Sequence, residues 1–296
     1  MQGKIVRLSG NTAKVNISGE VVSAVAYQNT KATNMYVGDN VVLLKDDVLG
    51  YVITEVLPRE NMLIRPNVTN VDVAVILIST VPEPDLFVLD RILVNCEQNE
   101  LETIIVINKN DIVGKDFIDD IKAQYKDAVD DIIITSCVDK TGIAKLKKAI
   151  LGKTAVFVGQ SAVGKSTIIN LLGVSDYIKT NELALKVGKK KERGKNTTRG
   201  ATLYSLDGQT FLADTPGFES MSLLEIRVNE LIYYYRDLRD YLKNCKYGVS
   251  CTHMNETEEC GILEALQAGK VNKDRYTRFI RLQNQLKRMW EKKYGK

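Results

Sequence analysis

The chain has 296 residues, of which 44% are hydrophobic and 26% are charged. This length predicts two or three domains, and the composition is that of a protein that buries a core. No stretch approaches the roughly eighteen apolar residues of a membrane helix, and the N-terminus lacks the apolar core of a signal peptide. We therefore expect neither a membrane span nor secretion. The net charge of +4 is too small to indicate a nucleic-acid partner by itself.

Residues 1–66 consist of short runs of alternating apolar and polar residues, separated by Gly, Asn and Asp. This pattern predicts a small antiparallel β-barrel of four or five strands, which ends where Pro58 and Pro66 discourage regular pairing. Barrels of this kind commonly bind single-stranded nucleic acid, so we expect RNA contact. Through residue 65 the segment is nearly neutral, with seven Lys/Arg and six Asp/Glu.

Residues 67–220 alternate strand-like and helix-like patterns, beginning with the continuous apolar run VDVAVILIS at 71–79. Such alternation predicts a mainly parallel, doubly wound sheet with helices on both faces. A hairpin at 201–215 is expected to end this second domain. Residues 221–296 are helical and polar in pattern and are expected to form a third domain.

A phosphate-binding motif lies at residues 159–166, where GQSAVGKS matches G-x-x-x-x-G-K-[ST] between a predicted strand and a predicted helix. Its backbone N–H groups are expected to surround phosphate oxygens, aided by the helix N-terminus. The strand–helix context argues against a chance match in a glycine-rich turn. The nucleotide-binding residues of this loop are predicted to be Gly159, Gln160, Ser161, Ala162, Val163, Gly164, Lys165, Ser166 and Thr167.

A second motif, N-K-x-D at residues 108–111, follows another predicted strand. The Asp111 carboxylate is expected to accept the adjacent N1–H and N2–H₂ donors of guanine, an arrangement that adenine does not offer. Asn108 is expected to brace the loop, and the stem of Lys109 to lie along the base. Alone the motif is weak, since a polar turn after a strand looks the same.

Three further segments resemble GTPase elements. Thr135, Ser136 and Cys137 close the next predicted strand, where a backbone N–H can meet guanine O6. The DTPG sequence at 214–217 offers Asp214 for Mg²⁺ through water and the Gly217 N–H for the γ-phosphate. The NTT sequence at 196–198 offers a threonine hydroxyl to the metal, and we favour Thr198 over Thr197.

Together these elements predict GTP hydrolysis and a role in it for each of several residues. Lys165 is expected to neutralise the β- and γ-phosphates, and Ser166 and Thr198 to ligate Mg²⁺. The predicted catalytic residues are Lys165, Thr198, Asp214 and Gly217. The guanine motif precedes the phosphate motif, so the usual order is rotated, and the segment after DTPG runs directly into the C-terminal domain.

Three of the five cysteines and the single histidine lie close together, as Cys245, Cys251, His253 and Cys260. Three thiolates and one imidazole complete a tetrahedral structural zinc site, and the crowding indicates a reducing compartment. The alternative is buried free thiols beside a surface histidine. Cys96 lies on an apolar helix face and is not expected to be a ligand.

The rotated motif order, the N-terminal barrel and the Cys/Cys/His/Cys pattern together resemble the RsgA (YjeQ) family of ribosome small-subunit biogenesis GTPases, over essentially the whole chain. The resemblance implies an OB-fold, a circularly permuted GTPase domain that binds GTP and GDP, and a zinc domain. It further implies binding to the small ribosomal subunit and its rRNA, hydrolysis stimulated by that subunit, and release linked to hydrolysis. Other assembly factors are possible partners. We expect a cytoplasmic monomer.

The chain departs from the family pattern at several positions. Ala162 replaces a usual glycine, which is expected to be a mild change. Asn196 replaces a histidine that has been given a hydrolytic role in the family, and Phe218 stands where many GTPases carry a water-orienting glutamine. Neither residue acts as a base near neutral pH, so we expect very slow intrinsic turnover until RNA or ribosomal protein orders residues 186–200.

Two basic segments favour RNA contact. Residues 186–200 carry seven Lys/Arg, and residues 270–296 carry ten, which supplies salt-sensitive affinity for phosphates. The alternative for the C-terminal segment is a solvated helix with a buried apolar stripe of Tyr276, Phe279, Leu282, Leu286 and Met289. Two other functions stay open: a signalling switch that docks a protein effector, and a small-molecule kinase, which the guanine motif opposes.

Overall fold

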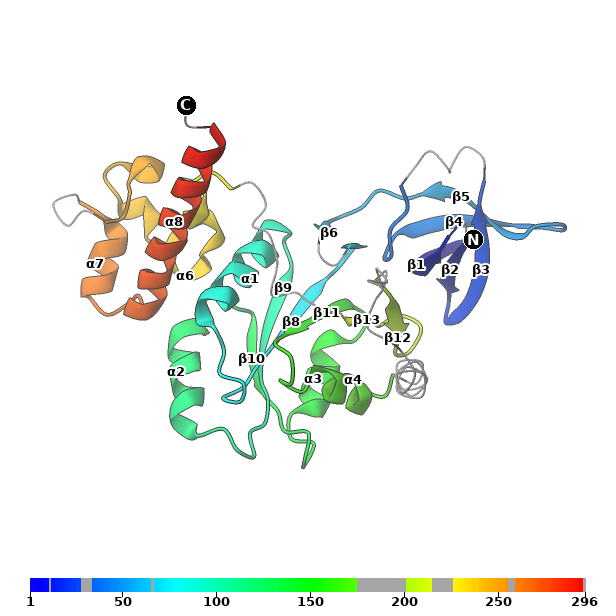
Figure 1. Cartoon of the computed structure of the whole chain (residues 1–296), viewed down its shortest axis with the longest axis horizontal. Helices are drawn as coiled ribbons and strands as arrows, with labels where there is room; N and C mark the ends of the chain where they lie inside the picture. The colour runs from blue at the N-terminus through cyan, green and yellow to red at the C-terminus, as the bar shows by residue number, and fades with distance from the viewer. Residues whose placement is uncertain are drawn as a thin grey trace, which may run out of the picture.

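The computed structural model describes residues 1–10, 12–27, 34–64, 67–174, 201–214, 226–254 and 259–294. Figure 1 shows three parts in a row: a barrel at one end, a sheet with helices in the middle, and a helical part that carries the C-terminus. No helix among these residues is long and apolar enough to cross a bilayer. The predicted domain limits of 1–66, 67–220 and 221–296 stay a prediction.

The N-terminal part is a closed barrel with strand order β1-β2-β3-β5-β4, in which β4 also pairs with β1. Its strands are β1 (Gln2–Ser9), β2 (Thr12–Ile17), β3 (Glu20–Ala26), β4 (Asn40–Asp46) and β5 (Gly50–Val56). Aliphatic side chains such as Ile5, Val15 and Leu43 fill the interior, which confirms the predicted barrel. The prediction of purely antiparallel pairing is wrong for β3 and β5, which run parallel. A closed ring with an odd number of strands cannot alternate direction throughout, so one pair must be parallel.

The segment after the barrel contains a short hairpin that the sequence did not predict. Strands β6 (Met62–Ile64) and β7 (Asn67–Thr69) pair antiparallel on either side of Pro66. Only residues 65 and 66 separate the two strands in the sequence, and both lie outside the described residues.

The central part contains a six-stranded sheet in the order β10-β9-β8-β11-β13-β12. The strands are β8 (Val73–Ile78), β9 (Glu102–Ile107), β10 (Asp131–Ile134), β11 (Thr154–Gly159), β12 (Leu203–Ser205) and β13 (Phe211–Asp214). All neighbours are parallel except β12 and β13, which form the expected closing hairpin. Every residue of β8 is buried, because helices cover both faces of the sheet.

Four helices cover this sheet, two on each face. They are α1 (Leu86–Gln98), α2 (Lys115–Tyr125), α3 (Ile143–Ile150) and α4 (Lys165–Leu172). Helices α1 and α2 pack with Ala74 and Ile76 of β8, whereas α3 and α4 pack with Val73 and Val75 on the opposite face. The predicted doubly wound arrangement is therefore confirmed.

The barrel contacts the edge of this sheet. An antiparallel bridge pairs Arg7 of β1 with Thr202, the residue before β12. The turn between β12 and β13 lies against the barrel so closely that a Cβ on Gly208 would be 3.0 Å from the Cα of Gly19. The barrel therefore covers the edge strand β12.

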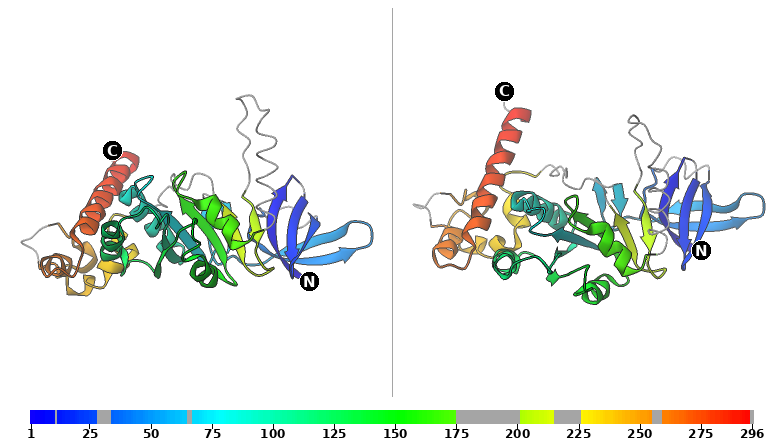
Figure 2. Two further views of the ribbon diagram at one scale, coloured as in Figure 1. Left: turned by 90° about the horizontal axis from the view of Figure 1, so that it is seen from below. Right: turned by 60° about the horizontal axis from the view of Figure 1, so that its bottom comes forward.

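The C-terminal part is built from short helices around a small core. Its elements are η4 (Leu231–Tyr234), α6 (Arg236–Arg239), η5 (Leu242–Asn244), η6 (Gly248–Ser250), α7 (Gly261–Gln267) and α8 (Lys273–Tyr294). Phe279, Leu282 and Leu286 of α8 are buried, as predicted for its apolar stripe. The prediction is wrong for Met289, which is 51% exposed, because the last turns of α8 extend past the other elements (Figure 2).

A buried ionic network joins the central and C-terminal parts. Asp90 of α1 has no exposed side-chain area, and its Oδ2 accepts from the Nε of Arg278 at 2.8 Å. Its Oδ1 accepts from Arg275 and from the Tyr125 hydroxyl, and Arg275 also donates through Nε to Asp237 Oδ2 at 2.9 Å. Burial and the Asp90 carboxylate raise the pKa of Tyr125, so the phenol stays protonated and keeps donating.

The Asp90→Asn substitution is expected to destabilise this junction by about 3 kcal/mol, because two buried guanidinium groups lose their shared counter-charge. The measurement is the urea midpoint followed by fluorescence of Trp290, the only tryptophan. The matched control is Asp131→Asn, which removes an exposed pair with Lys145 of 2.8 Å and should change stability by less than about 1 kcal/mol. Equal shifts in the two variants would contradict the prediction.

Candidate functional site

The candidate site lies at the edge of the sheet where the parallel strands end. Strand β8 has β9 on one side and β11 on the other, so the direction of winding reverses between β8 and β11. Ligands of open α/β sheets bind at such a switch point, outside the carboxyl ends of the strands. The phosphate loop (residues 159–167) follows β11, and the guanine segment (residues 107–113) follows β9. The structure therefore brings the two predicted motifs to one edge.

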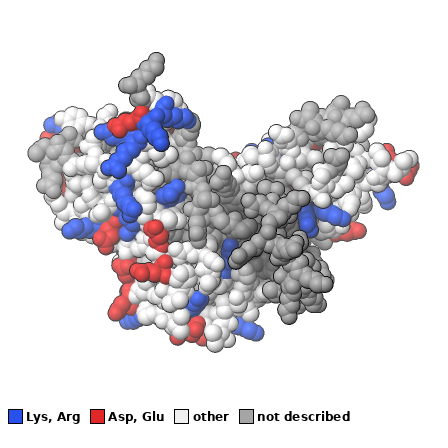
Figure 3. Space-filling model, viewed as in Figure 1, with Lys and Arg blue, Asp and Glu red and all other residues white. Residues whose placement is uncertain are grey.

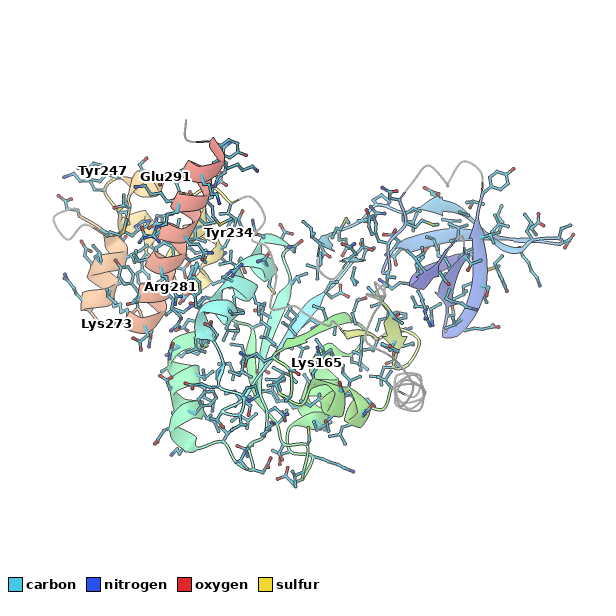
Figure 4. All side chains as sticks on the ribbon, in the orientation of Figure 1. Lys165, Tyr234, Tyr247, Lys273, Arg281 and Glu291 are labelled. Atoms are coloured by element: carbon cyan, nitrogen blue, oxygen red, sulfur yellow. The ribbon has the colours of Figure 1, made fainter. Side chains whose placement is uncertain are left out.

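The phosphate loop has the backbone of an anion-binding turn. The φ angles are +66° at Ala162 and +102° at Gly164, and helix α4 begins at Lys165. Left-handed residues between right-handed ones point successive N–H groups to one side, towards a bound anion. The left-handed conformation costs alanine about 1 kcal/mol more than glycine, so the departure at Ala162 is mild. Figure 4 shows Lys165 at the start of α4.

Asn108 connects three segments of the site. Its side chain is buried, and its Nδ2 donates to the Val163 carbonyl of the phosphate loop at 2.9 Å. Its Oδ1 accepts from the Thr135 hydroxyl at 3.0 Å, and the Cys137 thiol lies 3.6 Å away. The amide therefore holds the guanine segment, the phosphate loop and the loop after β10 in one arrangement.

This contact requires glycine at position 164. A Cβ there would be 2.2 Å from the Asn108 Nδ2, so the Gly164→Ala substitution must break the bond to Val163. We expect the affinity for GTP to fall roughly tenfold or more, because a buried amide loses its partner. Gly173→Ala is the matched control, since Gly173 has a φ of +93° but nothing within 4 Å of a built Cβ. Nucleotide titration checks this, and similar affinities of the two variants would refute it.

The Asp111 side chain is exposed, next to the segments that Asn108 holds together. Its Oδ1 accepts from the Ser136 hydroxyl at 2.8 Å, which ties the guanine segment to the loop after β10. The Ser136 N–H donates to Thr141 and the Val138 N–H to the Ser136 hydroxyl. Among the described residues, the Cys137 N–H has no such acceptor, and it is the amide of this loop that can meet a ligand oxygen.

A further segment of the site was not predicted from the sequence. The ammonium of Lys109 donates to the carbonyl of Val81 at 2.7 Å, and Lys109 itself has a φ of +64°. Val81 lies between β8 and α1 at the same edge of the sheet. The sequence did contain a signal for this segment. It follows β8, and every loop that follows a parallel strand reaches this edge of the sheet.

The remaining predicted site residues lie where the structure gives less detail. Asp214 is the last residue of β13, so its backbone lies at the carboxyl edge beside β11. Thr198 and Gly217 lie outside the described residues, as do Asn196 and Phe218. Their roles stay predictions.

The four predicted zinc ligands converge in the C-terminal part. Cys245, Cys251, His253 and Cys260 are buried, and their ligand atoms all lie within 4.8 Å of one another. The Sγ atoms of Cys245 and Cys260 are 3.8 Å apart. A tetrahedral zinc ion with Zn–S bonds of about 2.3 Å places its sulfurs about 3.8 Å apart. The arrangement is therefore compatible with a structural zinc ion.

Burial affects the protonation of two predicted ligands in opposite senses for zinc binding. Burial lowers the pKa of His253 to about 4, so the imidazole is neutral at pH 7 and its nitrogen can coordinate. Burial raises the pKa of Cys260 to about 12, and a divalent cation among the ligands would oppose that shift by stabilising the thiolate. The Tyr276 hydroxyl donates to the His253 carbonyl and fixes the backbone at this ligand.

Comparison with known proteins agrees with the geometry. The model of the RsgA GTPase family matches residues 56–224. The small ribosomal subunit biogenesis GTPase RsgA of Alkaliphilus metalliredigens is 32% identical over 292 residues, which are 97% of this chain and 98% of that protein. YjeQ from Thermotoga maritima has a TM-score of 0.81 at 30% identity and covers 96% of this chain and 98% of its own. YloQ, a circularly permuted GTPase, has a TM-score of 0.79 at 28% identity, with 97% and 95% covered. The chain therefore belongs to the RsgA GTPase family.

Proposed function

We propose that this protein hydrolyses GTP during late maturation of the small ribosomal subunit. The hydrogen bond from Asn108 to Val163, at 2.9 Å, carries the proposal because it holds a guanine-type segment and a phosphate loop at one sheet edge. Its relatives are named small ribosomal subunit biogenesis GTPases, which supports the ribosomal setting. The protein would act as a monomer in the cytoplasm. Its partners would be the small subunit with its rRNA and other assembly factors.

The base end of the site would select guanine. The Asp111 carboxylate would accept N1–H and N2–H₂, while the Cys137 N–H would donate to O6. Ser136 already donates to Asp111 and so holds the carboxylate in place. Adenine would leave the carboxylate without these donors, and the desolvated oxygens would then weaken binding.

The phosphate end would stabilise the charge that moves during hydrolysis. Lys165 and the loop N–H groups would surround the β- and γ-phosphates. The Ser166 and Thr198 hydroxyls would hold Mg²⁺, which would supply positive charge to the phosphates, and Asp214 would contact it through water. Water would attack the γ-phosphorus and the bond from that phosphorus to the bridging oxygen would break, giving GDP and inorganic phosphate, with the protons of the water passing to the phosphate and to solvent.

The small subunit would activate GTP hydrolysis. Neither Asn196 nor Phe218 can act as a base near neutral pH, and a phenyl ring cannot orient water. GTPases without their activator turn over at about 10⁻⁴ per second even with a water-orienting glutamine. We therefore propose that rRNA or ribosomal protein orders residues 186–200, and that hydrolysis is linked to release.

The Cys/His cluster would hold one structural zinc ion. Four protein ligands leave no open position for substrate, so the ion would stabilise the C-terminal part without taking part in the chemistry. Helix α8, which comes after α7, offers a basic surface, because Lys and Arg gather along it (Figure 3). Arg281, Arg288 and Lys292 line a groove there, and the Arg281 guanidinium lies 4.1 Å from the Phe87 ring centroid. We propose that this groove and the barrel contact rRNA phosphates.

The decisive experiment measures GTP hydrolysis with and without purified small subunits. We expect slow turnover alone and a large stimulation by the subunit. Turnover of several per second without the subunit would overturn the activation scheme. Co-sedimentation with a non-hydrolysable GTP analogue tests subunit binding, and its absence would favour a signalling switch. Preference for ATP in a nucleotide panel would favour a kinase.

A further inference from the structure

The hairpin between β4 and β5 presents aliphatic side chains far from the nucleotide site. Val48 is 90% exposed, Leu44 is 60% exposed and Leu49 is 59% exposed. The hairpin runs out beyond the barrel, away from the central sheet (Figures 1 and 2). Scattered exposed aliphatic residues are ordinary, but these three lie on one projecting hairpin, with Val48 and Leu49 in its turn and Leu44 on β4 opposite Val52. We call Leu44, Val48 and Leu49 the apolar tip.

The turn that carries the apolar tip is well structured. The Asp46 Oδ1 accepts from the N–H groups of Val48 at 2.8 Å and Leu49 at 2.7 Å. Gly50, the first residue of β5, follows the turn with a φ of +75°, a conformation that favours glycine. The backbone that carries Val48 and Leu49 is therefore held in a defined arrangement, which lowers the entropy lost on binding.

The charges around the apolar tip argue against RNA as its partner. Asp46 and Asp47 are both exposed, against one neighbouring cation, Lys45. Nucleic-acid surfaces use cations for phosphates and aromatic rings for bases. The turn itself, residues 46–50, contains no aromatic ring, and Tyr51, which lies opposite Lys45, is half-buried against the barrel core. Two carboxylates beside aliphatic side chains instead complement an apolar pocket with a basic rim.

We propose that the apolar tip docks into an apolar pocket, rimmed by Lys or Arg, on a protein component of the small ribosomal subunit. The inference rests on the proposed function, which supplies the particle. Proteins that bind rRNA carry Lys and Arg to neutralise phosphates, so the basic rim is a general property of such partners. The apolar tip would thus add a contact with a ribosomal protein to the contacts with rRNA phosphates proposed for the rest of the chain.

Two variants test the contact with purified small subunits and a non-hydrolysable GTP analogue. The double variant Val48→Ser, Leu49→Ser is expected to bind the subunit at least about tenfold more weakly, because two buried aliphatic side chains are lost. Leu151→Ser is the matched control, since Leu151 is 56% exposed and follows α3 of the central part, and it should bind as the parent does. Asp47→Lys separates the partner classes: it weakens binding to a basic rim and strengthens binding to RNA.

A photo-crosslinking residue in place of Val48 identifies the contacted molecule directly. The expected product is a crosslink to a ribosomal protein that disappears when excess unlabelled parent protein is added. Crosslinks to RNA alone, no crosslink, unchanged binding of the double variant, or tighter binding of Asp47→Lys would each overturn the inference. If the parent protein itself fails to bind subunits, the proposed function fails instead, which is a distinguishable result.

Discussion

The Asp111→Asn variant is expected to lose about a thousandfold in affinity for GTP and to bind XTP more tightly than the parent does. The carboxylate would accept two guanine donors, and charge-assisted hydrogen bonds contribute about 1.5–3 kcal/mol each. Xanthine has a carbonyl where guanine has the amino group, and an amide can donate to it. Since the Ser136 hydroxyl donates to one Asp111 oxygen at 2.8 Å, the amide oxygen can take that place and its NH₂ can face the base.

Calorimetric titration of the parent protein and of Asp111→Asn, each with GTP and with XTP, checks this exchange of specificity. The control is Asp116→Asn, the same change at an exposed residue in the first turn of α2, which should leave both affinities as they are. A variant at Asp111 that still discriminates GTP from XTP as the parent does would remove the basis for the guanine assignment.

Removal of zinc by a chelator is expected to unfold residues 226–294 while the barrel and central sheet stay folded. Structural zinc sites contribute about 10–16 kcal/mol of apparent binding free energy, which exceeds the stability of most small domains. The C-terminal core depends on the cluster directly, because Cys245, Cys251 and Cys260 belong to it together with Phe279 and Leu282.

Trp290 reports this unfolding, since its Nε1 donates to the carbonyl of Ile226 at 2.8 Å across the C-terminal part. Its fluorescence should change on chelation and recover with one equivalent of zinc but not with magnesium. A fluorescent guanine nucleotide monitors the central sheet in the same sample. Loss of zinc without any change at Trp290 would show that the ion is not structural.

The parts of the site that could be predicted from the sequence are those in which adjacent residues carry the chemistry. The phosphate loop has its glycines, lysine and serine within eight consecutive residues, and the zinc ligands lie within sixteen. That one pair of barrel strands runs parallel could also have been deduced, because five strands in a closed ring cannot all pair antiparallel, although this reasoning does not identify the pair as β3 and β5. Periodicity alone correctly placed Phe279 and Leu282 in the buried stripe.

Contacts between distant segments could not be predicted. Asp90 stands in an apolar helical run with no local sign that Arg275 and Arg278, about 185 residues later, will surround it. The exposure of Met289 depends on where α8 passes the end of its neighbours, which periodicity does not record. The bond from Lys109 to Val81 likewise depends on the path of a loop.

The contact of the barrel with β12 has a consequence for how the protein avoids self-association. An unpaired edge strand offers free N–H and C=O groups on which another chain can add a strand. Strand β12 is one edge of the central sheet, and the bridge between Arg7 and Thr202 places β1 against it. The barrel precedes β12 in the sequence, and N-terminal domains generally fold first during synthesis. We therefore expect the barrel to be in place to cover this edge when β12 forms, without help from another molecule.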